Sequence, residues 1–199
     1  MTLYTPMTDG ELGRAAQINY RLQELEDAIL EGEGLMRART AWTTLSADAA
    51  SITIPVTAGD NTLMLMANLM TDYGAQAYDT VLLTFNNDTA STYTVRYGSV
   101  DGGGSVVDAS GTTGFPLAKA AGTNATNNYF SFLKFTIPQA SDLLAKACRY
   151  SSMLPYVPPT YNDGLGIYPT AATIASIKLA PLNGTVFVSG SRYALFGVN

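Results

Sequence analysis

The residue types that most often perform catalysis are scarce in this chain. It contains no histidine and one cysteine, Cys148. The absence of histidine removes Ser-His-Asp and Cys-His machinery and the commonest transition-metal ligand. A single cysteine excludes a cysteine-rich zinc site, and we expect Cys148 to be a small buried apolar residue. The glycine-rich segment 101–105 lacks the Lys-Ser/Thr ending of a phosphate-binding loop. The sequence therefore predicts no catalytic residue, no metal site and no cofactor.

Aspartates are the remaining candidates for chemistry. A glycosidase uses two carboxylates as acid and base, and the candidates here are Asp79, Asp88, Asp101, Asp108 and Asp163. Aspartates beside Asn and Gly are usually turn residues, which favours a structural role. Segments 60–61 and 87–89 offer oxygen ligands for calcium, but the chain has no twelve-residue calcium loop. A glycan-degrading enzyme with paired aspartates is kept as an alternative function.

Tyrosines indicate a binding surface more strongly. Several lie in or beside the Pro-rich segment 155–170. Exposed tyrosines next to Asn and Asp are common where proteins bind sugars or other proteins. The alternative is that the rings pack against the sheets and stiffen a long loop. The candidate surface residues are Tyr156, Tyr161, Asn162, Asp163 and Tyr168.

The elements that would carry these residues divide into two parts near Gly34. Eleven of the 27 charged residues lie in the first 40 positions, and no glutamate follows Glu33. Glutamate favours helices, whereas aspartate favours turns. We therefore expect residues 1–40 to form an N-terminal anchor and oligomerisation helix, and residues 41–199 to form a separate head domain.

The expected helix has an oligomerisation stripe. Segment 8–11 has the form of a capping box. Apolar residues then follow at alternating steps of three and four, the spacing of a short coiled coil. The mixture of residue types at these positions favours a homotrimer over a dimer. An amphipathic helix packed on its own domain would show the same stripe. The stripe residues are Ala15, Ile18, Leu22, Leu25 and Ile29.

The head reads as mainly β. Runs rich in Val, Ile, Thr, Tyr and Phe predict strands, and they cover residues 51–56, 62–70, 80–86, 92–97, 128–137, 173–179, 185–188 and 192–198. Asn183-Gly184 predicts a hairpin between the runs on either side of it. Segments 101–126 and 155–170 are expected to be long loops, with one helical turn within 139–146. The pattern predicts an antiparallel β-sandwich that is jelly-roll-like.

Composition excludes two classes of partner. The net charge is −5 and the 11 Lys and Arg residues form no cluster, whereas nucleic-acid binding needs clustered positive charge. No run reaches the roughly 18 apolar residues of a membrane-spanning helix. We expect neither nucleic-acid binding nor membrane insertion.

Two parts of the head resemble virion proteins of tailed bacteriophages. The first comprises residues 173–179 and 187–198, and the second comprises residues 80–88 followed by Tyr93. In that group a pair of strands ends in a Gly-Ser-Arg-aromatic-x-Leu-aromatic-Gly motif near the C-terminus, which here spans residues 190–197. The resemblance covers most of residues 42–199, and the N-terminal part does not match.

This resemblance implies a non-enzymatic structural protein located in the virion and assembled in the host cytoplasm. It implies a trimeric fibre or receptor-binding appendage, or alternatively a capsid decoration (cement) protein. No catalytic residues come with it. The expected partners are further copies of the chain, other virion proteins through the N-terminus, and a host-surface glycan or protein.

Overall fold

The computed structural model describes residues 36–57, 59–90, 93–100, 105–124, 130–154 and 160–198. Within these ranges the chain is mainly β and contains no helix, so no membrane-spanning helix is found there. The expected N-terminal helix, with Ala15, Ile18, Leu22, Leu25 and Ile29, lies outside the described residues, as does Tyr156.

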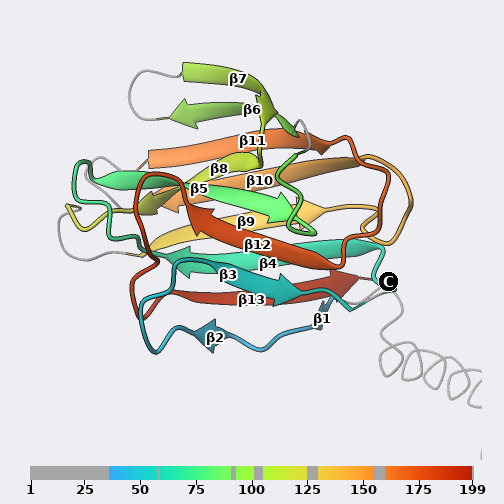
Figure 1. The fold of residues 1–199 in the computed structure, drawn as a ribbon, viewed down its shortest axis with the longest axis horizontal. Coiled ribbons are helices and arrows are strands. Elements are labelled where there is room, and N and C mark those ends of the chain that lie inside the picture. Colours follow the sequence, from blue (N-terminus) through green and yellow to red (C-terminus); the bar gives the residue numbers. More distant parts are fainter. Residues whose placement is uncertain are drawn as a thin grey trace, which may run out of the picture.

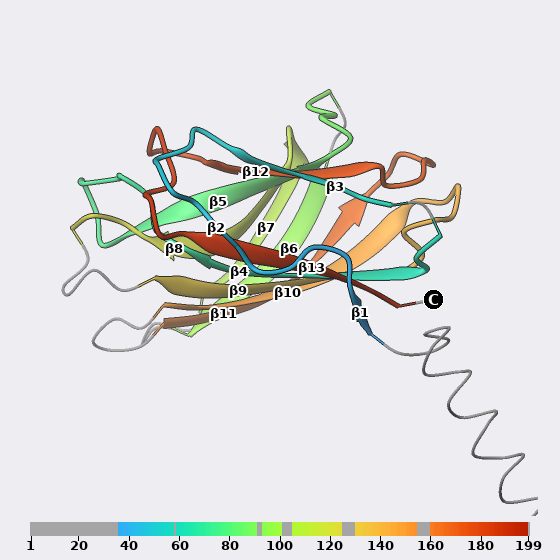
Figure 2. The same ribbon diagram turned by 90° about the horizontal axis from the view of Figure 1, so that it is seen from below.

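Two antiparallel sheets pack face to face (Figures 1 and 2). The larger sheet has the order β1-β13-β4-β9-β10-β11-β6-β7, with β2 also paired to β13, and the smaller has the order β3-β12-β5-β8. The strands are β1 Arg37–Ala38, β2 Thr43–Thr44, β3 Ile52–Pro55, β4 Thr62–Leu69, β5 Tyr78–Phe85, β6 Tyr93–Val100, β7 Ser105–Thr112, β8 Phe115–Ala121, β9 Ser131–Ile137, β10 Lys146–Leu154, β11 Thr160–Tyr168, β12 Ser176–Pro181 and β13 Arg192–Val198.

Side chains that are buried at every second position of a strand fill the space between the two sheets. In β4, buried residues alternate with partly exposed ones, so Leu63, Leu65, Ala67 and Leu69 all point inward. An aromatic cluster continues this core towards β6 and β11. The rings of Tyr93 and Tyr168 stack with centroids 5.0 Å apart. Burying a large apolar side chain contributes about 1.5–3 kcal/mol, so this interior is the main source of stability. Cys148 is buried in it, as predicted.

Both expected long loops contain strands, and this is a correction to the sequence prediction. Segment 101–126 includes β7 and β8, and segment 155–170 includes β11. The glycines of β11 are sites of close packing. A Cβ on Gly164 would lie 2.6 Å from the Tyr150 ring, and one on Gly166 would lie 2.4 Å from the Phe115 ring. Only glycine lets these rings lie against the strand.

The hairpin predicted at Asn183-Gly184 is also wrong. β12 pairs with β3 and β5, whereas β13 pairs with β4 in the other sheet. Run 185–188 forms no strand, and only Phe187 makes isolated bridges there. The buried carboxylate of Asp79 accepts hydrogen bonds from the backbone N–H groups of Asn183 and Gly184, at 3.1 and 2.8 Å. The Asn-Gly pair therefore lies in the segment that connects β12 of the smaller sheet to β13 of the larger sheet. Segment 139–146 forms turns without a helix.

The first described strand, β1, pairs with the last strand, β13. Arg39 forms an ion pair with the buried carboxylate of Asp60. A Cβ on Gly197 would overlap that carboxylate, so glycine in β13 makes room for the pair. Residues 37–39 are therefore held against the sandwich.

Candidate binding surface

The outward residues of β9, β10 and β11 form one exposed face, which we call the β9–β11 face. Side chains in strands alternate between the two sides of a sheet, and the register places them in rows. Ser151 lies between Lys134 on β9 and Asp163 on β11. Arg149 lies between Thr136 and Leu165 in the next row. Polar groups from three strands therefore meet on one surface.

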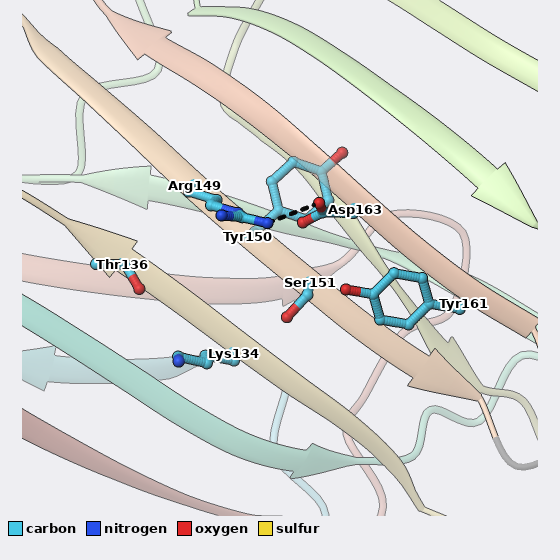
Figure 3. Close-up of a pocket in the computed structure, with 7 residues that line it drawn as sticks. All are labelled: Lys134, Thr136, Arg149, Tyr150, Ser151, Tyr161 and Asp163. Atoms are coloured by element: carbon cyan, nitrogen blue, oxygen red, sulfur yellow. Dashed lines mark hydrogen bonds and ion pairs between the residues drawn. The ribbon is translucent and has the colours of Figure 1, made fainter.

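A depression of about 480 Å³ opens on this face (Figure 3). Its size lies within the usual range of small-molecule sites, about 300–1,000 Å³. Three strands supply its lining, and most of the side chains are polar or charged. They are Lys134 and Thr136 from β9, Arg149, Tyr150 and Ser151 from β10, and Tyr161 and Asp163 from β11. We refer to it as the central depression.

An ion pair crosses the central depression. Arg149 Nη2 donates to Asp163 Oδ2 at 3.1 Å, shown by the dashed line in Figure 3. Its hydrogen bond with Asp163 raises the pKa of Arg149, and the attraction between their charges adds to this. Both side chains are exposed to water, and exposed pairs add little to stability. The consequence of the pair is orientation, because it holds a cation and a carboxylate in fixed positions at the wall.

Two buried polar atoms of β10 and β11, the hydroxyl of Tyr150 and Oδ1 of Asp163, have no hydrogen-bond partner among the described residues. They belong to opposite sides of the sheet, because Asp163 lies on the β9–β11 face whereas the Tyr150 ring points into the core and lies against Gly164. Burial raises the pKa of Tyr150, so its hydroxyl keeps its proton and is a donor at any physiological pH. Asp163 Oδ1 is an acceptor. Unsatisfied buried groups are rare in native structures and often mark a functional position.

The structure separates the predicted surface residues. Tyr161 and Asp163 lie in the central depression. Asn162 is buried on the opposite side of β11, where Nδ2 donates to Ser152 Oγ at 3.3 Å. Tyr168 is buried in the core and donates to Asp88 Oδ2 at 3.0 Å. For Asn162 and Tyr168, the packing alternative fits the observed positions.

Other residues of the central depression were not singled out from the sequence, namely Lys134, Thr136, Arg149 and Ser151. In the structure, residues 146–154 alternate between buried and exposed positions, which places Arg149 and Ser151 on one face. The residue types do not follow this alternation, because Lys146 and Ser152 are buried and Met153 is exposed. Which strands flank that face depends on sheet order, and no local pattern encodes sheet order.

The described aspartates mostly support backbone. Asp79 binds the 183–184 turn, and Asp88 Oδ1 accepts from the N–H of Ala90 at 3.0 Å. The described residues contain no group of three or more His, Cys, Asp or Glu side chains that could hold a metal ion. What the β9–β11 face can do is bind, through an exposed ring, charged groups and hydroxyls.

A second depression of about 470 Å³ adjoins the first across β11 and reaches β6. It shares Arg149 and Asp163 and adds Arg96 and Leu165. Leu165 and Ile167 are exposed apolar side chains on the same side of β11. The β9–β11 face therefore continues as a mixed apolar and cationic surface towards the sheet edge.

No protein-family model matches this chain, and no curated protein matches it at a significant level of similarity.

Proposed function

We propose that this chain is a non-enzymatic structural protein of a virion, a trimeric fibre or receptor-binding appendage that is anchored by its N-terminal segment and binds a host surface with its head. The observation that carries the binding role is the central depression, where three neighbouring strands place an exposed tyrosine, an oriented ion pair and two further hydroxyl side chains on one open face. The virion setting rests on the sequence resemblance described above.

The order of the strands supports a jelly roll with two added hairpins. If β1 and β2 count as one interrupted strand, and the hairpins β6–β7 and β10–β11 are set aside, eight strands remain. In chain order they pair as 1-8-3-6 in the larger sheet and 2-7-4-5 in the smaller. This is the order of a jelly roll, an architecture used by viral capsid proteins and lectins.

The two hairpins explain why one face is suited to binding. Both join the larger sheet beyond β9 and extend it well past the smaller sheet (Figure 1). β10 and β11 contribute most of the central depression. We infer that the jelly roll is the scaffold and that the β10–β11 hairpin carries the binding surface.

The charge arrangement favours binding over glycan hydrolysis. Hydrolysis needs two carboxylates facing one cleft, about 5–10 Å apart. Among the residues described as lining the two depressions on this side of the sheet, Asp163 is the one carboxylate, and it is paired with Arg149. A soluble polysaccharide incubated with the protein should therefore keep its chain length.

Immunogold electron microscopy of intact particles tests the proposed function. Antibodies against the head should label an appendage, and antibody bound beforehand should block adsorption to host cells. Label distributed over the capsid would identify a decoration protein instead. Particles that carry no label would contradict a virion role.

A further inference from the structure

We propose that the loop between β9 and β10 is a contact between neighbouring heads of the trimer, made by the exposed side chains of Leu143 and Leu144. We call residues 138–145 the β9–β10 loop. The inference rests on the proposed function, because it requires copies that are joined through their N-terminal segments. It concerns a different set of residues from those that line the central depression.

The register places the β9–β10 loop at the end of the sandwich where the described chain begins. Arg37 of β1 lies opposite Gly197 of β13. Gly197 lies opposite Leu63 of β4, which in turn lies opposite Ile137, the last residue of β9. This row crosses three strand spacings, about 14 Å, and Figure 1 shows β1 and the connection from β9 to β10 at the same end of the sheet. Segment 1–35 therefore joins the head close to the loop.

The β9–β10 loop is held in one conformation by a buried lysine. Lys146 is fully buried, and its ammonium group donates to the backbone carbonyls of Asp142 and Leu144. The N–H and the carbonyl of Ala140 are also hydrogen-bonded, to the segments that precede β4 and β12. Lysine is almost never fully buried unless its charge is bound. The loop is thus built around the ammonium group, and its outward side chains have fixed positions.

Two large apolar side chains project from this loop into water. Leu143 is 70% exposed and Leu144 is 53% exposed. Met36, which directly precedes β1 at the same end of the sandwich, is 51% exposed. Single exposed apolar side chains are common on protein surfaces, whereas a group of them can mark a contact site. A head by itself leaves all three side chains in water.

The length of chain before β1 argues for a second copy as the partner. Residues 30–36 separate Ile29, the last residue of the oligomerisation stripe, from β1. Seven residues span at most about 25 Å even when fully extended. In a trimer joined by the stripe, the ends of the three heads that carry the β9–β10 loops are thus held near one another.

The small size of the apolar group also fits tethered copies. Two leucines bury far less than the roughly 1,200–2,000 Å² of a complex that forms from separate molecules. A short tether raises the effective concentration of its ends to the millimolar range, so that a weak contact still forms. We therefore expect the loops to meet within a trimer and not between free heads.

Cross-linking of the full-length protein through one engineered cysteine tests this inference. The native cysteine, Cys148, is buried, and burial raises its pKa to about 12, so it does not compete for thiol reagents. Leu143→Cys should join copies through a short bismaleimide at least tenfold faster than Leu182→Cys. Leu182 is 51% exposed and follows β12. It lies at the far end of that strand, because the other end begins beside the loop, where Ile174 donates to Ala140.

A second substitution tests the contact itself. Adding Leu144→Asp to the Leu143→Cys protein should slow cross-linking about tenfold, because a charge opposes burial of the loop between copies. Adding Leu182→Asp instead introduces the same charge at the other end and should leave the rate unchanged. Both proteins should melt like the unchanged protein, since Lys146 binds the backbone of residue 144 and not its side chain. Equal cross-linking rates for the two would overturn the inference.

Sedimentation and maleimide labelling separate this inference from the proposed function. If the protein is a trimer whose Leu143→Cys thiol reacts with a monofunctional maleimide but forms no cross-link, the loop is open to a different protein. The inference is then wrong and the trimer stands. If that thiol is shielded and forms no cross-link, the chain's own segment 1–35 covers the loop, which also overturns the inference. A protein that sediments as a monomer contradicts the proposed trimer, and the tethered contact with it.

Discussion

Tyr161 and Tyr168 lie on one strand, seven positions apart, and face opposite sides of the sheet. Tyr161 belongs to the exposed face, where Asp163 lies two residues further along β11. Tyr168 stacks on Tyr93 in the interior. At the scale of single residues, the side of the strand decides which of these rings is available to a partner.

Replacing Tyr161 and Asp163 together by alanine should weaken attachment to the host surface by about 1–3 kcal/mol, the loss expected for a binding hot spot. The physical reason is the loss of the exposed ring and of the carboxylate that orients Arg149. Binding to isolated envelope measures the effect, alongside a melting curve and sedimentation.

Leu182→Ala is the matched control, because Leu182 is 51% exposed and follows β12 of the smaller sheet. Full binding by the double variant, or a collapsed melt, would assign Tyr161 and Asp163 to packing.

Arg192 opens β13, as the sequence indicated, and stabilises the adjoining chain. Its guanidinium lies over the Trp42 ring, 5.0 Å from the centroid. With the Asn68 amide oriented to satisfy both side chains, Arg192 also donates two hydrogen bonds to the Asn68 oxygen, at 3.0 and 3.1 Å. Arg192→Lys should lower the free energy of unfolding by about 0.5–1.5 kcal/mol, the net contribution of a hydrogen bond, because lysine cannot make both bonds to Asn68 at once. Denaturant unfolding measures it, and Trp42→Ala in a double-mutant cycle shows whether the two residues are coupled.

At the scale of elements, two glycines allow β11 to pack closely against the core, because they have no side chain. Gly164 and Gly166 let Tyr150 and Phe115 fill the space that side chains would occupy. Gly166→Ala should therefore destabilise the protein by about 1–3 kcal/mol, the usual cost of overpacking. Gly74→Ala is the matched control, since its nearest contact would be an ordinary 3.5 Å to Thr123 Oγ1. Equal unfolding midpoints for the two variants would contradict the packing role of Gly166.

The segment that connects β12 to β13 should be less stable at acid pH. Burial alone would raise the pKa of Asp72, but hydrogen bonds from the Thr185 hydroxyl and from the backbone N–H groups of Val186 and Thr185 outweigh it and hold the pKa below its ordinary 3.8. A carboxylate with a lowered pKa contributes stability above pH 3.8, and loses that contribution as pH falls through the folded-state pKa.

Asp72→Asn should thus lower the melting temperature at neutral pH, and the difference from the unchanged protein should shrink below about pH 3.8. Calorimetry from pH 2 to 7 measures this. A difference that is constant across that range would mean that the charge of Asp72 is not what stabilises this segment.

At the scale of the whole molecule, charge is divided unevenly along the chain. Residues 1–35 contain seven acidic and two basic residues, whereas the remainder contains nine of each. The head is thus close to neutral and the N-terminal segment carries the net charge. We have proposed separate roles for the two parts, oligomerisation and anchoring in one and binding in the other, and an uneven charge is compatible with that proposal.

We expect the purified protein to sediment as a trimer through the stripe that contains Leu22 and Leu25. Replacing both by Asp should yield monomers whose heads melt close to the unchanged temperature, because charge in the seam of a coiled coil opposes association. Gln17→Asp with Gln23→Asp adds the same charge outside the stripe and should leave the trimer intact. A monomeric unchanged protein would contradict this expectation.

The sequence by itself determined the mainly β class and the residues that line the interior wherever burial repeats every two positions, as in Ile52–Pro55 and Thr62–Leu69. It also pointed to Tyr161 and Asp163. These features are local, because alternation and residue type can be read along one strand.

Only the tertiary structure decided the identity of β11 as a strand, the connection at Asn183-Gly184 and the meeting of Arg149 with Asp163. Each depends on a neighbour that is distant in sequence. The glycines of β11 lie against aromatic rings of other strands, and the Asn183-Gly184 turn is bound by the buried carboxylate of Asp79. Arg149 and Asp163 meet because their strands lie side by side. Sheet order and register arise from long-range pairing, whose partners are set by packing of the whole core. The candidate binding surface lies across three strands, so it exists only once that order is established.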